Sequence, residues 1–134
     1  MVCEPFVKFN QIGGGSSVTK DQENRVYIMT FDMIYVFKDQ LRSRKYSIKD
    51  VGAILESSQN KTDFMLFFER SDDLQVSTKN RKEVLDLLKL RFNCLNRNIT
   101  LRVYSVSDKE LLMYLKNNDS KNKKAGIYDL PDDS

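Results

Sequence analysis

The residues of this 134-residue chain that most suggest chemistry are basic side chains gathered in one stretch. Residues 38–49 hold five Lys or Arg residues against a single acidic residue, Asp39. Lysine and arginine donate charge-assisted hydrogen bonds, which are strong when several converge on a phosphate. The stretch predicts a surface for an anionic ligand, and a solvated loop on an ordinary charged surface is the alternative. The five are Lys38, Arg42, Arg44, Lys45 and Lys49.

The charge along the rest of the chain is polarised more strongly than the net charge of +3 suggests. Residues 50–78 carry two basic against six acidic side chains, and residues 79–102 carry seven basic against two. In this second basic stretch Asp86 lies four residues from Lys82 and three from Lys89, so a helix would let these charges neutralise each other. We therefore expect a solvated helix face there. Nucleic-acid binding would require basic residues interleaved with exposed aromatics, and we expect no such partner.

Catalysis is poorly supported by the residue types present. The chain has no histidine, which argues against Ser-His and Cys-His nucleophiles, His general bases and most catalytic zinc sites. Asp63, Glu69, Asp72 and Asp73 cluster in the sequence, but around a hairpin turn we expect them to be exposed, and a glycosidase pair needs a larger cleft. We predict that the protein is not an enzyme and uses no metal, cofactor or small-molecule substrate.

The composition is that of one globular domain, with 40% hydrophobic and 31% charged residues. A chain of this length buries roughly 65–70% of its unfolded surface, enough for one core. Cys3 and Cys94 have no CxxC spacing, which favours a reduced intracellular protein, and Cys94 is expected to be partly buried on a helix. The longest apolar runs, such as Phe64–Phe68, are far shorter than the roughly twenty residues that cross a bilayer. No apolar segment follows Met1, so any membrane contact is expected to be peripheral.

Short segments rich in Val, Ile, Tyr and Phe predict about seven strands, separated by turn residues. This pattern is typical of a small antiparallel barrel or sandwich. The glycines Gly13–Gly15 lack the spacing of a phosphate-binding loop, and we expect a flexible loop from Gly13 to about Glu23. The expected strands are residues 6–12, 24–31, 33–38, 44–48, 51–55, 62–69 and 74–78.

The apolar period then changes to three and four residues, which predicts an amphipathic helix from Asn80 to about Leu95. Asn80 and Glu83 form a plausible capping pair, and Arg91 is expected on the polar side. An extended stretch at residues 99–104 and a second short helix opening at Ser107 are expected to follow. From Lys116 onward the composition predicts a disordered or loosely docked tail.

The order of these segments, together with their sequences, resembles the tail-homology domain of class I myosins, which is a pleckstrin-homology-like module. The resemblance covers residues 6–105 and implies a seven-stranded, strongly bent sheet closed by a C-terminal helix. Together with the composition of the two ends, it gives the expected domain limits: a flexible N-terminus at 1–5, the module at 6–105, a short helical extension at 106–116 and a disordered or loosely docked tail at 117–134. The segments that carry it are Asn24–Thr30, Met33–Val36, Arg44–Ile54 and Thr62–Phe68.

Modules of this kind commonly bind anionic lipid headgroups at the open end of the barrel, between the loops after the first and third strands. That position would add Lys8, Lys20 and Arg25 to the basic residues of the 38–49 stretch. The second strand departs from the usual basic pattern, because Arg25 follows the acidic Asp21 and Glu23. Specific phosphoinositide binding, weaker binding of acidic lipids such as phosphatidic acid or phosphatidylserine, and no lipid binding therefore all stay open. The predicted headgroup site comprises Lys8, Lys20, Arg25, Lys38, Arg42, Arg44 and Lys45.

The functional prediction is a cytoplasmic, peripheral membrane-targeting module that binds phosphoinositide or phosphatidic acid headgroups through these basic loops. The alternative is a protein-interaction module of the same fold with no lipid role, within a cytoskeletal or motor-associated protein. An exposed sheet edge would then accept a segment of the partner as an added strand. The partners expected are thus an anionic membrane surface or another protein.

Overall fold

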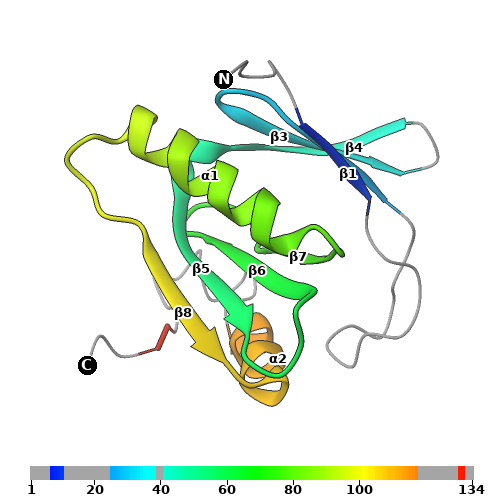
Figure 1. The fold of residues 1–134 in the computed structure, drawn as a ribbon, viewed down its shortest axis with the longest axis vertical. Coiled ribbons are helices and arrows are strands. Elements are labelled where there is room, and N and C mark those ends of the chain that lie inside the picture. Colours follow the sequence, from blue (N-terminus) through cyan, green and yellow to red (C-terminus); the bar gives the residue numbers. More distant parts are fainter. Residues whose placement is uncertain (1–6, 11–24, 39–40, 118–129, 132–134) are drawn as a thin grey trace.

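Two four-stranded sheets form the framework in the computed structural model, which describes residues 7–10, 25–38, 41–117 and 130–131 (Figure 1). The first sheet has the order β1-β2-β3-β4, with every neighbouring pair antiparallel. The second has the order β7-β6-β5-β8, and the short 3-10 turn η1 (Ile48–Asp50) leads from the first sheet into it. The strands are β1 (Val7–Asn10), β2 (Val26–Met29), β3 (Met33–Lys38), β4 (Leu41–Ser47), β5 (Val51–Ser57), β6 (Asp63–Phe68), β7 (Leu74–Ser77) and β8 (Arg102–Val106).

Alternation of buried side chains fixes which face of the first sheet meets the core. Tyr27 and Met29 on β2 and Ile34 and Val36 on β3 are buried, whereas the residues between them are partly exposed. Successive side chains of a strand point to opposite faces, so these four define the core-facing side. Tyr46 extends this side onto β4, where it is paired with Ile34.

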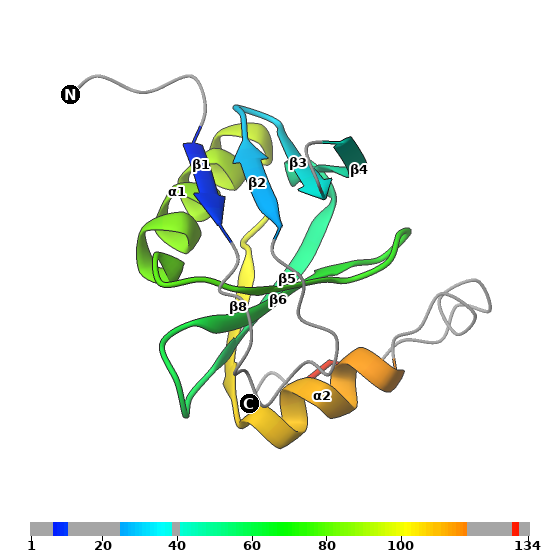
Figure 2. The ribbon, with the colours of Figure 1, turned by 90° about the vertical axis from the view of Figure 1, so that its right-hand side faces the viewer.

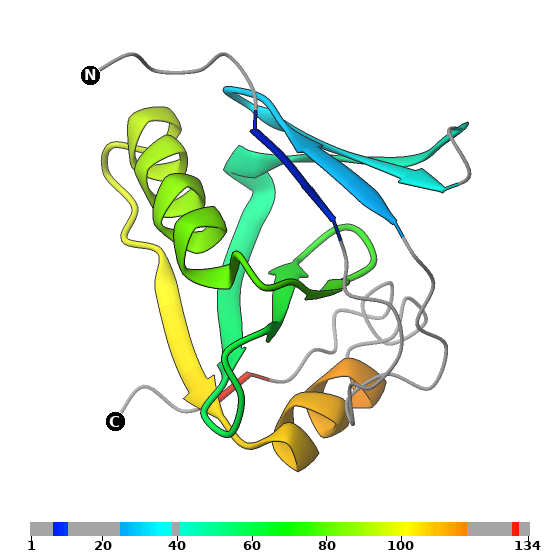
Figure 3. The ribbon, with the colours of Figure 1, turned by 45° about the vertical axis from the view of Figure 1, so that its right-hand side comes forward.

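The two sheets meet over a shared core closed by helix α1 (Arg81–Leu95), as the views in Figure 2 and Figure 3 show. The Tyr46 ring stacks on Phe68 of β6, with ring centroids 4.8 Å apart. From α1, Leu85, Leu88 and Phe92 enter the same core. Seven strands followed by a closing helix is the order of elements predicted from the sequence.

Strand β6 is buried along its whole length because helices cover both faces of the second sheet. Phe64, Leu66 and Phe68 belong to the α1 core, while Met65 and Phe67 belong to a second cluster under helix α2 (Asp108–Asn117). Figure 3 shows α1 and α2 on opposite sides of this sheet. A strand covered on both faces needs a continuous apolar run, which explains the sequence of residues 64–68.

The expected antiparallel barrel or sandwich is confirmed in part. The described strands form two sheets and no closed barrel, and all pairs among the first seven strands are antiparallel. The additional strand β8 pairs in parallel with β5, from Ala53 opposite Arg102 to Ser57 opposite Val106. Parallel neighbours need a long crossover connection, which β6, β7 and α1 supply here. The predicted extended stretch at 99–104 is therefore real but begins later, at Arg102.

Helix α1 begins where the periodicity predicted, but two details of its chemistry differ. Asn80 makes no side-chain capping bond. Arg91, expected on the polar face, is only 5% exposed. Its guanidinium donates to the carbonyl oxygens of Met29 and Thr30 and lies 5.4 Å from the centre of the Phe31 ring. The turn between β2 and β3 provides these partners, which explains why this cation is buried.

A polar network ties the start of α1 to the turn before β6. Arg81 donates to the carbonyl oxygens of Ser57, Asn60 and Asp63. The Asp63 carboxylate accepts from Ser77 Oγ at 2.6 Å and is 2% exposed, so the prediction that it is a solvated acid is wrong. It lies at the start of β6, opposite Ser77 in the sheet, rather than in an open turn.

Helix α2 opens as predicted, with Ser107 and Glu110 forming a reciprocal capping pair. Asp108 anchors it by accepting from Ser57 Oγ and Asn60 Nδ2. Leu111 is fully buried under the second sheet. The tail residues 118–129 lie outside the described residues, so the domain limits proposed for the C-terminus stay predictions.

Two further expectations concern exposure. Cys94 is exposed, because its place on α1 lies away from the core, and the expected partial burial is wrong. Among the described residues, no helix is long and apolar enough to cross a membrane.

Candidate functional site

The hairpin formed by β3 and β4 carries most of the basic side chains predicted to bind an anion. Its register runs from Met33 opposite Ser47 to Lys38 opposite Leu41. Strand β4 is an edge of the first sheet, and residues 41–45 are all exposed. Figure 1 and Figure 3 show the far ends of β3 and β4 reaching away from α1. The hairpin thus presents its outer part to solvent.

A bulge in β4 decides which way its cations point. The register shifts between Val36 and Phe37, so that Ser43 is an extra residue, and its hydroxyl donates to the Val36 carbonyl oxygen. Arg44 is consequently opposite Val36, on the core-facing side, whereas Arg42 is opposite Phe37, on the outer side. Two arginines that are two residues apart therefore lie on different faces.

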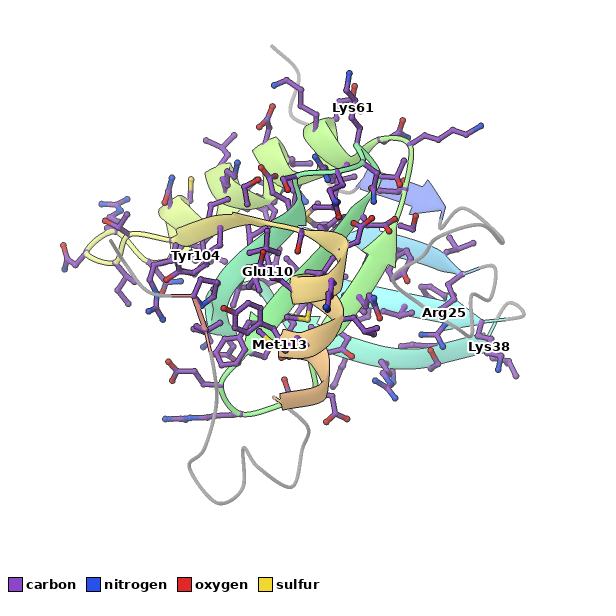
Figure 4. The ribbon with its side chains drawn as sticks, turned by 90° about the horizontal axis from the view of Figure 1, so that it is seen from below. Arg25, Lys38, Lys61, Tyr104, Glu110 and Met113 are labelled. Carbon is purple, nitrogen blue, oxygen red and sulfur yellow. The ribbon has the colours of Figure 1, made fainter. Side chains whose placement is uncertain are left out.

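Three cations share the core-facing side at the outer end of the first sheet. Arg25 directly precedes β2 on the side of Tyr27, and Lys38 ends β3 on the side of Val36. Arg44 joins them from β4. Figure 4 shows Arg25 and Lys38 at the same end of this sheet. The structure therefore brings together three of the seven predicted site residues here.

Electrostatics in this group involve the two buried tyrosines of the first sheet, Tyr27 and Tyr46. Burial raises the pKa of Tyr27 to about 12, and the nearby charge of Arg25 lowers it in part. Arg44 donates to the Tyr46 hydroxyl at 3.3 Å, which raises the pKa of Arg44, and Asp72 in the β6–β7 turn adds to that effect. Both shifts favour the form that each group already has at physiological pH, so Tyr27 remains neutral and Arg44 remains charged.

The remaining predicted residues divide between the outer face and the part of the chain not described. Lys45, opposite Tyr35, joins Arg42 on the outer side. Lys8 of β1 is opposite Ile28, a register position of the same outer side. Lys20 and the Gly13–Gly15 loop lie outside the described residues. The predicted single cluster is thus distributed over two faces of one hairpin and its neighbouring strands.

Leu41 is a feature that the charge pattern did not reveal. It begins β4 with 74% of its surface exposed, next to Arg42 and opposite Lys38. The signal in the sequence is a lone leucine inside a basic stretch. An exposed leucine among cations matches the composition of segments that lie at membrane interfaces.

The second basic stretch, on α1, has mostly structural uses. Lys82 pairs with Asp86 at 3.0 Å on the exposed surface, as predicted. Arg81 and Arg91 are committed to backbone carbonyl oxygens, as described above. This arrangement leaves no row of solvent-facing cations on the described part of α1 that would suit a nucleic-acid backbone. Among the described residues there is also no group of three or more acidic or cysteine side chains that could hold a metal ion.

Comparison with known proteins gives likeness of fold and no family. No family model matches the chain, and no curated protein matches it significantly. Among solved structures, the hSac2 domain from human phosphoinositide phosphatase Sac2 matches with a TM-score of 0.50 and 6% identity, over 78% of this chain and 77% of that one. The linker-DH/PH domains of p115-RhoGEF match with a TM-score of 0.48 and 10% identity, over 71% of this chain and 30% of that one.

The order of elements is the one that the resemblance implied, since seven strands in two sheets lead into a closing helix. The likeness to the hSac2 domain is a likeness of fold alone. Neither of these two structures is a myosin, so the resemblance to the class I myosin tail stays a prediction.

Proposed function

We propose that this chain is a peripheral membrane-binding module that docks on anionic phospholipids through the β3–β4 hairpin. A pleckstrin-homology-like fold can bind lipids or proteins, and the hairpin favours lipids. The observation that carries the proposal is the exposed Leu41 at the start of β4, with cations on both faces of the hairpin around it. These cations are Lys38, Arg42, Arg44 and Lys45.

In the proposed orientation the outer end of the hairpin points toward the membrane, and side chains on both faces of the hairpin contact the headgroups. Long basic side chains extend along apolar surface and keep their charge at the headgroup level, so cations on opposite faces reach the same membrane plane. Each contributes about 1 kcal/mol near an anionic leaflet, and four contribute roughly 4 kcal/mol. Burying Leu41 in the interface adds about 1 to 2 kcal/mol. The sum supports reversible recruitment to the cytoplasmic face of a membrane.

The division of the cations also bears on lipid preference. A stereospecific headgroup site needs donors that converge on one phosphorylated ring. Arg42 and Lys45 lie on the opposite face from Arg25, Lys38 and Arg44, and Asp72 adds negative charge near Arg44. We therefore propose that several lipid phosphates bind at once, with phosphatidic acid or mixed phosphoinositides recruiting the module through charge density.

Co-sedimentation with liposomes tests the proposal. Vesicles of neutral phosphatidylcholine should not bind the protein, and vesicles doped with phosphatidic acid, phosphatidylserine or phosphoinositides should bind it, more weakly as salt rises. Reversing Arg42, Arg44 and Lys45 to Glu should abolish binding. The matched control reverses Lys82, Lys89 and Lys109, which makes the same change in net charge away from the hairpin.

The two triple variants distinguish a binding site on the hairpin from a general effect of the protein's net charge. Equal losses in the two triple variants would refute a site on the hairpin. Leu41→Ser should weaken binding by several-fold while leaving its salt dependence unchanged, because only apolar contact is lost. Absence of binding to every anionic vesicle would leave a protein-interaction module as the function.

The protein-interaction alternative has one structural observation in its favour. Strand β8 pairs with β5 and is itself an edge strand of the second sheet. Its residue Val103 is 40% exposed. A partner segment added there would bind through backbone hydrogen bonds. Such binding should change little when salt is raised or when Arg42, Arg44 and Lys45 are reversed.

A further inference from the structure

An apolar cluster lies where β8 and α2 meet, on the side of the second sheet that faces away from α1. Fully buried side chains of β5 and β6 form its base. Strand β8 adds Tyr104 and Val106, and α2 adds Leu111 and Tyr114. These four residues form what we call the β8–α2 site. It shares no residue with the β3–β4 hairpin.

Leu130 packs against this cluster from the segment that follows α2, and Figure 1 shows the described part of that segment, in red, beside β8. Residues 118–129 separate Leu130 from Asn117, the last residue of α2. Leu130 and Pro131 are partly buried and belong to no helix or strand. Release of these two residues would therefore unpair no strand and unwind no helix among the described elements.

The seated segment has a distinctive chemistry. Pro131 disfavours a helical backbone at the residue before it, so Leu130 belongs to an extended piece of chain. Exposed Arg102 precedes Tyr104 by two residues on β8 and therefore lies on the same face of the sheet. A cation beside an apolar site suits a leucine that has acidic neighbours. In the sequence the Leu130–Pro131 pair is flanked by Asp129, Asp132 and Asp133.

We propose that the β8–α2 site docks an extended segment of a partner protein, in which leucine and proline are flanked by acidic residues. The chain's own Leu130 and Pro131 occupy the site in competition with that partner. The partner's leucine contacts the apolar cluster, its proline lowers the entropy lost on docking, and its acidic residues interact with Arg102. A tethered segment has an effective concentration of roughly 1 mM, so it excludes weak competitors and yields to a partner that binds more tightly.

NMR titration of the full chain with a synthetic peptide of residues 126–134 tests this assignment. Leu130→Asp removes the competing side chain, so this variant should bind the peptide with a dissociation constant below about 1 mM. The backbone amides of residues 103–106 and 111–114 should shift saturably. The unmodified chain should bind the same peptide several-fold more weakly, because its own segment occupies the site. A peptide that itself carries Leu130→Ala should bind about tenfold more weakly than the natural one.

Two further variants test the charge and the position of the site. Arg102→Gln, combined with Leu130→Asp, should weaken peptide binding about threefold and reduce its dependence on salt. The matched control is Leu90→Asp, an exposed leucine on α1, on the other side of the second sheet. This control should bind the peptide as weakly as the unmodified chain does.

Thermal unfolding of each variant checks that the fold is kept, and Leu130→Ala, a milder change, should also increase peptide binding. Equal affinities of the unmodified chain and Leu130→Asp, or shifts located outside the site, would overturn the proposal. An unchanged affinity in Arg102→Gln would overturn the acidic preference. Self-association in sedimentation that is lost in Leu130→Asp would make a second copy of this chain the occupant and overturn a separate partner. The measurement involves no membrane, so its outcome is independent of the hairpin's role.

Discussion

Replacing the buried Arg91 should destabilise the protein far more than replacing any exposed cation of the same helix. Its guanidinium donates to the carbonyl oxygens of Met29 and Thr30 and packs on Phe31. Hydrogen bonds from a charged donor contribute about 1.5 kcal/mol or more each, and the cation–π contact about 0.5 to 1 kcal/mol. Methionine recovers roughly 1 kcal/mol through its apolar stem. Arg91→Met should therefore cost about 2 to 4 kcal/mol.

Urea unfolding followed by circular dichroism measures this loss. A domain of this size is stable by roughly 5 to 15 kcal/mol, so the change is a large fraction of the total. With a slope of about 2 kcal/mol per molar urea, the midpoint should fall by about 1 to 2 M at constant slope. Arg91→Lys retains the charge but not the planar donor group, and it should cost about half as much.

The matched control is Lys82→Met, on the same helix. Lys82 forms an exposed ion pair with Asp86, and exposed pairs of this kind contribute at most about 0.5 kcal/mol. If Arg91→Met lowers the free energy of unfolding no more than Lys82→Met does, the anchoring role assigned to Arg91 is refuted.

Three further predictions concern the closely packed Gly52 and the buried Asp63 and Tyr27. Gly52→Ala should lower the free energy of unfolding, measured in urea, by about 1 to 3 kcal/mol, because the new Cβ would lie 2.9 Å from the Phe67 ring. An unchanged urea midpoint would contradict the close packing. Asp63→Ala should lower the free energy of unfolding by about 2 to 4 kcal/mol, because it leaves the buried Ser77 hydroxyl without its acceptor. Asp63→Asn should lower it less. Equal losses in the two variants would exclude the hydrogen bond as the cause. The pKa of Tyr27 is about 12 when folded and about 10 when unfolded, so its contribution to stability is complete below pH 10 and falls as pH rises from 10 to 12. In that window the free energy of unfolding of Tyr27→Phe should fall less steeply with pH than that of the unmodified protein, by up to about 1.4 kcal/mol per pH unit. Equal slopes for the two proteins would disprove the raised pKa.

Local patterns in the sequence were sufficient for the regular elements. The predicted strand at 33–38 and the helix from residue 80 to Leu95 agree closely with β3 and α1. The opening of a second helix after Ser107 was also predicted correctly, whereas the capping bond predicted for Asn80 does not form. These signals depend on spacings of two to four residues, which the chain displays without its tertiary contacts.

The errors occurred where a distant segment supplied the partner. Arg91 has the position of a solvent-facing residue in the helical period, and only the β2–β3 turn, about sixty residues earlier, provides its acceptors. Asp63 lies in an acidic, turn-rich segment, yet Ser77 and the turn before β6 bury it. A polar side chain is buried only when partners satisfy it, and nothing in its own neighbourhood identifies those partners.

For the candidate site, too, local features could be predicted from the sequence and long-range contacts could not. By itself the sequence determined that residues 38–49 are basic, that two strands flank a turn there and that the chain lacks the histidine of many catalytic sites. Only the tertiary structure decided that a bulge at Ser43 sends Arg42 and Arg44 to opposite faces, that β8 fills the edge of β5, and that Leu130 packs against the apolar cluster of the β8–α2 site. Charge and periodicity are properties of neighbouring residues, whereas register and convergence depend on how strands pair across the whole chain.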